Sequence, residues 1–147
     1  MYNNMWFPNT RFFDVINKEK LIKLEEEVIG SLSDDDFKKY FLERKERHGV
    51  KNVVTCDAPI VILIVKNERA NEDWIKIDAG IASMSIIVAA QNFGIESMCL
   101  GIVANEKCEE LFGLKKGSLV LGVAIGKPKG KIELKPKVIK SKVSYVE

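Results

Sequence analysis

The stretch from Lys76 to Val103 reads KIDAGIASMSIIVAAQNFGIESMCLGIV, and it decides the fold. Its first part is a long apolar run, which predicts a helix from about Trp74 to Phe93 that ends at Gly94. The helix is apolar nearly all the way round, which is typical of a buried helix. The chain then resumes as a shorter apolar run, which predicts a strand from Ile95 to Val103.

One face of the predicted helix carries small and polar side chains at spacings of three and four residues. Its members are Asp78, Ala82, Ser85, Ala89 and Asn92. Small side chains would let another backbone come close. The helix therefore lies at a subunit interface or under a flat cofactor, or it packs tightly in the core of one monomer. The helix pattern alone favours the monomer core.

Two glycines frame the strand that follows the helix. Gly94 allows the positive φ that ends a helix. Gly101 lies near the far end of the strand, where a glycine often marks close approach of the backbone to a ligand. In open α/β sheets, ligands tend to lie beyond the carboxyl ends of the strands. A simple turn at Gly101 explains the spacing equally well, so both interpretations stay open.

The rest of the sequence alternates strands with helices. The run IVILIVK after Pro59 is β-branched and apolar, as expected of a strand that is covered on both faces. Ser33 is expected to cap a helix, because the three aspartates after it suit the positive end of a helix. The remaining expected elements are strands at 12–16, 60–66 and 119–125 and helices at 18–29, after Ser33 and at 106–112. This order predicts an α/β or α+β architecture in three layers.

Length and composition limit the class of protein. The 147 residues are expected to form one domain, 1–147, that is long enough for a real core. Hydrophobic residues make up 46% and charged residues 30%, as in ordinary globular chains. The net charge of +2 argues against binding of polyanions by bulk charge.

Nothing in the sequence predicts a membrane span, a secretory signal or a metal site. The opening MYNNMWFPN lacks the basic start and the uninterrupted apolar core of a signal. The apolar run of 77–93 holds an aspartate and several polar residues, so we do not expect it to cross a membrane. Three cysteines, Cys56, Cys99 and Cys108, and one histidine, His48, form no zinc or disulfide pattern. A cytoplasmic location is therefore expected.

Four segments in order resemble the nitroreductase-like family of FMN-dependent flavoproteins. They are PNTRFFDVINKEKL at 8–21, DAPIVILIVKNE at 57–68, IDAGIASMSIIVAAQNFGIESMCLGIV at 77–103 and CEELFGLKKGSLVLGVAIGKPKG at 108–130. The shared pattern is an Asn-Thr segment before a strand, an Ala-Pro strand, a long Ala-rich helix with an Asp, a strand ending near Gly, and a strand ending in Gly-x-Pro. The resemblance covers about residues 9 to 137.

The resemblance implies an α+β fold in three α/β/α layers, with a central mixed, mainly antiparallel sheet and a long buried helix. It implies an obligate homodimer with two FMN molecules at the subunit interface. NADH or NADPH would reduce the flavin, and the flavin would reduce a nitroaromatic, quinone or similar acceptor. Because the flavin carries the hydride chemistry, we expect no general acid or base from the protein.

The resemblance also carries cofactor contacts over to single residues. Asn9 matches the family's flavin-contacting Asn, with Thr10 beside it and Arg11 where the family has Gln. An amide both donates and accepts hydrogen bonds, which suits a flavin edge. A turn before a strand explains an Asn equally well. Leu100 and Gly101 match the turn that passes backbone over the flavin ring.

The lysine-rich tail supplies the last contacts that the resemblance implies. Lys135 and Lys137 match the pair that meets the FMN phosphate, where a lysine acts as a point charge. Taken alone, these lysines are typical of a solvated basic arm. Binding of nucleic acid through them is a weaker alternative, because the clustering is modest.

The main departure from the family lies at the front of the chain. Family members begin with a helix whose Arg-x-Ser-x-Arg cluster grips the phosphate and ribityl chain, and this sequence starts after that point. The chain is a short variant that binds flavin by other groups, a relative that has kept the dimer and lost the redox chemistry, or a sequence that lacks upstream residues. The second explanation gives an alternative function: non-catalytic dimeric binding of a flavin or nucleotide.

Overall fold

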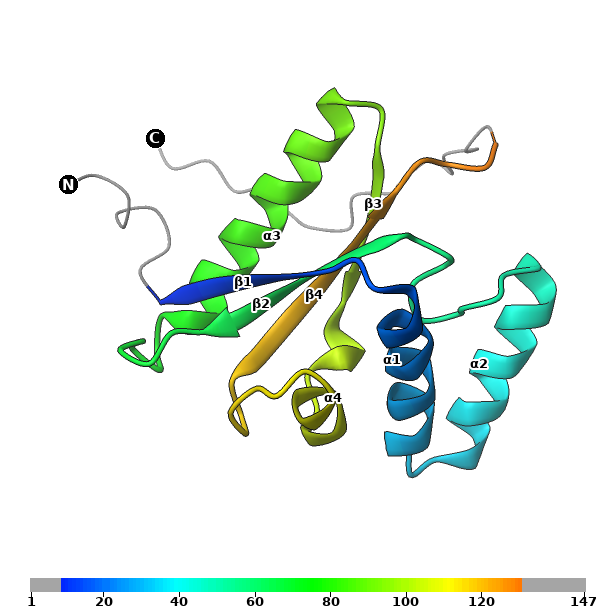
Figure 1. Cartoon of the computed structure of the whole chain (residues 1–147), viewed down its shortest axis with the longest axis horizontal. Coiled ribbons are helices and arrows are strands. Elements are labelled where there is room, and N and C mark those ends of the chain that lie inside the picture. Colours follow the sequence, from blue (N-terminus) through cyan, green and yellow to red (C-terminus); the bar gives the residue numbers. More distant parts are fainter. Residues whose placement is uncertain (1–8, 131–147) are drawn as a thin grey trace, which may run out of the picture.

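The computed structural model describes residues 9–130, whose strands and helices alternate as an α+β chain (Figure 1). In chain order they are β1 (Thr10–Val15), α1 (Lys18–Ser31), α2 (Asp35–His48), β2 (Ile60–Lys66), α3 (Ile75–Asn92), β3 (Glu96–Leu100), the 3-10 helix η1 (Gly101–Val103), α4 (Glu106–Leu111) and β4 (Leu119–Gly126). This order confirms the predicted α+β class.

Two local predictions need correction. The strand expected at Ile95–Val103 ends at Leu100, and the chain then turns through η1. The turn has a physical cause, because the Asn105 side chain donates a hydrogen bond of 3.0 Å to the carbonyl of Ile102 while it caps α4. At α2 the cap is Asp34 rather than Ser33, since the Asp34 carboxylate accepts from the first free N–H groups of the helix.

The strands form one sheet in the order β1-β2-β4-β3. Each neighbouring pair in the described residues is antiparallel, in keeping with the mainly antiparallel sheet that was expected. Thr10 pairs with Lys66, and Leu119 pairs with Val65, so β1 and β4 begin where β2 ends. Among the described strands, β1 and β3 lie at the two edges of the sheet.

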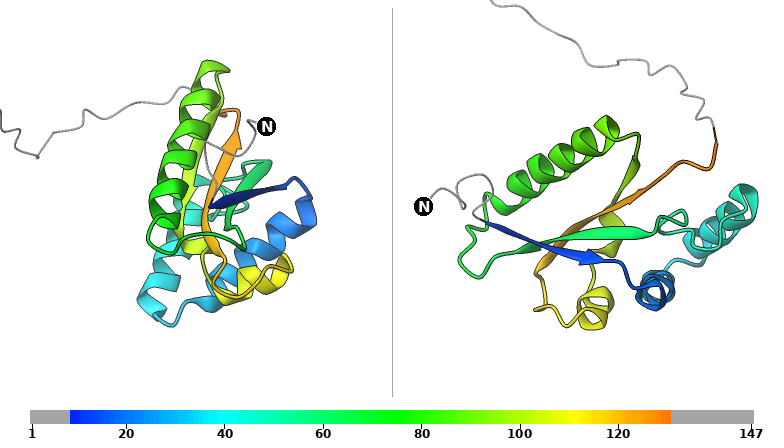
Figure 2. Two further views of the ribbon diagram at one scale, coloured as in Figure 1. Left: turned by 90° about the vertical axis from the view of Figure 1, so that its left-hand side faces the viewer. Right: turned by 45° about the horizontal axis from the view of Figure 1, so that its top comes forward.

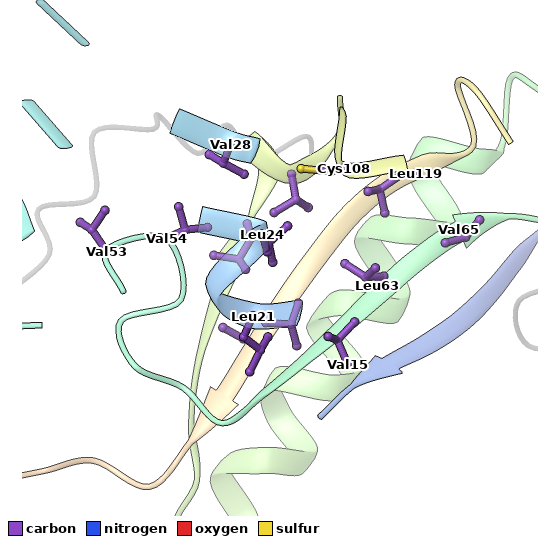
Figure 3. Packing of buried hydrophobic residues seen from close by; sticks show 14 of the residues in the cluster. Val15, Leu21, Leu24, Val28, Val53, Val54, Leu63, Val65, Cys108 and Leu119 are labelled. Carbon is purple, nitrogen blue, oxygen red and sulfur yellow. The ribbon is translucent and has the colours of Figure 1, made fainter. Parts of the chain in front are cut away.

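Helices cover both faces of the sheet and make three layers (Figure 2). α3 lies along one face, while α1 and α4 cover the other and α2 lies beside α1. The side chains of β2 alternate between two cores. Leu63 and Val65 pack with Leu24 of α1 in the larger core, shown in Figure 3, whereas Ile64 packs with Ala79 of α3 in the smaller one.

α3 buries only one of its sides. The sheet covers its buried residues, which are Ile75, Ala79, Ala82, Ser83 and Ala90. The opposite side exposes an apolar stripe at spacings of three and four residues, formed by Trp74, Ile77, Ile81, Met84 and Val88. Among residues 9–130, the elements that α3 contacts substantially are the strands of the sheet. Within residues 9–130, α3 is therefore not enclosed in the core of one monomer, which the pattern favoured.

Candidate functional site

Asn9 joins three segments of the chain at the start of β1. Its Nδ2 donates to Oδ2 of Asp78, in the first turn of α3, at 2.5 Å. Its Oδ1 accepts from the backbone N–H of Asn71 at 2.9 Å, and its backbone carbonyl accepts from the N–H of Asn67 at 2.8 Å. Asn9 therefore does form a turn before a strand, and long-range hydrogen bonds hold that turn in place.

The two residues after Asn9 lie in different environments. Thr10 is buried, with 7% of its surface exposed. Arg11 is exposed, and its guanidinium carbon lies 5.9 Å from the centre of the Phe13 ring, in a cation–π contact. Of these two residues, only Arg11 presents its side chain at the surface of the edge strand.

Leu100 and Gly101 lie at the other edge of the sheet. Leu100 is buried and packs in the larger core. Gly101 is exposed, and a Cβ added to it would meet no atom within 4 Å. Its carbonyl accepts from the N–H of Ala104 at 3.2 Å. Gly101 thus turns the chain, and it also leaves open space beside its backbone.

A single chain does not gather these predicted contacts in one place. Asn9 precedes β1 and Gly101 follows β3, with β2 and β4 between the two edges. Three strand spacings separate the edges by roughly 14 Å. Lys135 and Lys137 lie outside the described residues. Within residues 9–130, the predicted contacts therefore fall into two separate groups, which we call the Asn9 half-site (Asn9–Arg11) and the Gly101 half-site (Leu100–Gly101).

A hollow of about 560 Å³ lies at the opposite end of the sheet, where β2 begins and β4 ends. Its polar lining includes Arg44, His48, Cys56, Asp57 and Lys127. None of the predicted site residues within 9–130 lines it. Sequence reasoning missed this hollow because its walls come from segments that are far apart in the chain and form no motif.

Asp57 holds one wall of the hollow together. Its Oδ1 accepts from the N–H groups of Lys51 and Asn52 at 2.9 and 2.8 Å, and its Oδ2 accepts from Lys129 Nζ at 2.8 Å. Burial by itself raises the pKa of the Asp57 carboxyl. The hydrogen bonds and the charge of Lys129 outweigh burial and hold that pKa below its ordinary value of 3.8.

We expect the change Asp57→Asn to lower the free energy of unfolding at pH 7 by roughly 1 kcal/mol, because the amide loses the charge that pairs with Lys129. A carboxyl whose pKa falls on folding stabilises the protein above its unfolded pKa, and this stabilisation is lost as the pH drops through the folded pKa. The difference between wild type and variant should therefore be full at neutral pH and shrink as the pH falls below 3.8. Urea unfolding over a pH series measures it.

The matched control for this prediction is Asp14→Asn, which removes an exposed carboxylate from β1. It should change stability little at any pH. A stability difference between wild type and Asp57→Asn that stays constant down to low pH would contradict the role of the Asp57 charge.

Within residues 9–130, no helix has both the length and the apolar character that crossing a membrane requires. In the same residues, no three or more His, Cys, Asp or Glu side chains gather as potential metal ligands.

The sequence model of the Nitroreductase family matches residues 4–127. No curated protein matches the chain significantly. A nitroreductase with bound FMN from Bacteroides fragilis NCTC 9343 is 22% identical, with a TM-score of 0.74, over 96% of this chain and 78% of that chain. A nitroreductase with bound FMN from Desulfitobacterium hafniense DCB-2 is also 22% identical, with a TM-score of 0.72, over 95% and 76%.

A more distant similarity is to the NADPH:FMN oxidoreductase from Vibrio harveyi complexed with NAD+. It is 17% identical, with a TM-score of 0.63, over 96% of this chain and 61% of that chain. At these identities, the structural matches establish the shared fold.

Proposed function

This chain belongs to the nitroreductase family, and from that premise we propose that it is an FMN-dependent NAD(P)H oxidoreductase. The family match over residues 4–127 is the observation that carries the proposal. The electron acceptor would be a nitroaromatic, a quinone or a similar small molecule. Bound FMN supplies the hydride chemistry, so the work of the protein is to bind, orient and shield the reactants.

We propose that the functional unit is a homodimer joined through the exposed apolar stripe of α3. A row of large apolar side chains on one helix face is typical of a protein interface. In a twofold dimer the same patch on both chains pairs with itself. The separation of the half-sites supports a dimer too, because a second chain would bring its Gly101 half-site toward the Asn9 half-site of the first.

The described residues fit a flavin in two respects. With its two hydrogen bonds made, the Asn9 amide keeps one N–H and one lone pair free for the edge of the ring. The open space beside Gly101 lets a flat ring approach the backbone. We assign Asn9, Thr10 and Arg11 to one side of the cofactor and Leu100 and Gly101 to the other.

The remaining assignments rest on the family pattern. Lys135 and Lys137, outside the described residues, would meet the FMN phosphate as point charges. The NAD+ complex of the Vibrio harveyi enzyme supports a nicotinamide nucleotide as electron donor. The three cysteines are free thiols, which supports the proposal of a reducing, cytoplasmic location.

The visible spectrum of the purified protein, before and after addition of FMN, tests the proposed function. After FMN is added, we expect a flavin absorption band that stays with the protein on gel filtration. Under anaerobic conditions, NADH or NADPH should bleach this band. Protein that takes up no FMN would contradict the proposal. Bound flavin with no turnover across a panel of nitroaromatics and quinones would favour the non-catalytic alternative.

A further inference from the structure

We infer that Asp78 is a positioning residue that fixes the orientation of the Asn9 carboxamide toward the flavin. The inference rests on the proposed function, because it gives Asn9 the flavin edge as its target. It starts from the two hydrogen bonds that hold the Asn9 side chain from opposite sides, one from α3 and one from the loop before α3.

Each of the two partners of Asn9 can form a hydrogen bond with only one end of the amide. An ionised carboxylate such as Asp78 accepts hydrogen bonds and donates none, so it must face the NH₂ group. The backbone N–H of Asn71 only donates, so it must face the carbonyl oxygen. A flipped amide would place oxygen against oxygen and N–H against N–H, at the 2.5 and 2.9 Å distances seen here. The orientation of Asn9 is therefore set by its surroundings.

Asp78 suits this role better than a neutral residue would. It lies in the first turn of α3, where the helix dipole favours a negative charge. A hydrogen bond to an ionised acceptor is shorter and stronger than one between neutral groups. The contact also links residues that are 69 positions apart, so it fixes the start of β1 to the start of α3.

The consequence is a defined pattern of donors and acceptors in the Asn9 half-site. With both partners engaged, the amide presents one N–H donor and one oxygen lone pair. A ligand edge that has an acceptor for this N–H, as the carbonyls of a flavin ring do, would find the donor already oriented. Without Asp78 only the Asn71 N–H opposes a flip of the amide, so part of the population would present the wrong group.

The test is a double-mutant cycle on FMN affinity with Asn9→Ala, Asp78→Asn and both changes together. Asn at 78 keeps the shape of the side chain, but it both donates and accepts, so position 78 no longer discriminates between the two orientations of the Asn9 amide. We expect Asp78→Asn to raise the Kd for FMN by about tenfold. The double variant should bind FMN no more weakly than Asn9→Ala alone, because Asp78 acts through Asn9.

The matched control is Asp73→Asn, the same change of charge at an exposed position just before α3. It should leave the Kd for FMN unchanged. Thermal unfolding of each apo-protein separates a folding defect from a binding defect. Asp78→Glu keeps an acceptor-only group and should recover part of the affinity that Asp78→Asn loses.

The outcomes distinguish this inference from the proposed function. Wild-type protein that binds no FMN overturns both. If wild type and Asp78→Asn bind FMN equally tightly, the role of Asp78 is overturned and the proposed function stands. Additive losses of affinity in the double variant would have the same meaning. A second readout is the NMR spectrum of the apo-protein. The side-chain NH₂ group of Asn9 should give one sharp pair of proton signals in wild type, and a broadened pair or two pairs in Asp78→Asn.

Discussion

The change Ile81→Asp is expected to convert the protein from a dimer to a monomer and to abolish retention of FMN. Ile81 lies in the middle of the apolar stripe of α3 and is 53% exposed in the single chain. In a twofold dimer each such change places two carboxylates in one apolar interface. Burying an unpaired charge costs several kcal/mol, so the dimer dissociation constant should rise at least about a thousandfold.

Folding of each chain should survive this change. Because the Ile81 side chain already faces away from the sheet, the aspartate meets solvent in the monomer. Sedimentation velocity at several protein concentrations measures the association, circular dichroism checks the fold, and titration with FMN measures retention of the cofactor. A monomer that still folds and binds little FMN is the expected combination.

The chain offers a matched control on the other face of the sheet. Ile22 of α1 is 50% exposed, so Ile22→Asp repeats the same substitution at nearly the same exposure outside the stripe. It should leave both the dimer and the FMN affinity intact. A wild-type protein that is monomeric, or an Ile81→Asp variant that stays dimeric, would contradict the proposed interface.

α3 shows which features of the fold the sequence predicts and which it does not. Its apolar pattern and the Gly94 stop predict the helix and its end, and the structure has Gly94 at a φ of 65° as expected of such a stop. The pattern does not distinguish the side that packs on the chain's own sheet from the side that stays exposed, because both are apolar. That distinction needs the position of the sheet.

The residues of the candidate site also divide into those that the sequence indicated and those that it did not. The family pattern pointed to Asn9 and Gly101, but no local pattern relates Asn9 to Asp78, which lies 69 residues further along the chain. In the sequence, Asp78 stood out as the charged member of the small and polar helix face and as the Asp of the family pattern, with no sign that it pairs with Asn9. The strand that was expected to run through Gly101 to Val103 was predicted too long, because no break in hydrophobicity marks the turn, which the Asn105 side chain holds by its hydrogen bond to the carbonyl of Ile102.

Hydrogen bonds from side chains to the backbone of another segment also decide stability, and the largest effect on the free energy of unfolding is expected at Glu109 of α4. The Glu109 side chain is nearly inaccessible, with the residue 3% exposed. Its Oε2 accepts from the N–H of Gly117 and its Oε1 from the N–H of Leu119, both at 2.8 Å. The carboxylate thus fixes the loop that leads into β4, the strand that pairs with both β2 and β3.

We expect Glu109→Gln to lower the free energy of unfolding by about 3 kcal/mol. An amide has one acceptor oxygen, so it can satisfy one of the two N–H groups but must turn its NH₂ toward the other. The variant loses one charge-assisted hydrogen bond and leaves a buried donor facing a donor, and each such loss is worth about 1.5–3 kcal/mol. Urea unfolding of the apo-protein measures the difference. All samples should have the same protein concentration, because association adds to the apparent stability.

The control is Glu110→Gln, at the exposed neighbouring position, which should change the free energy of unfolding by less than about 0.5 kcal/mol. Equal effects of the two changes would show that Glu109 does not hold the entry to β4.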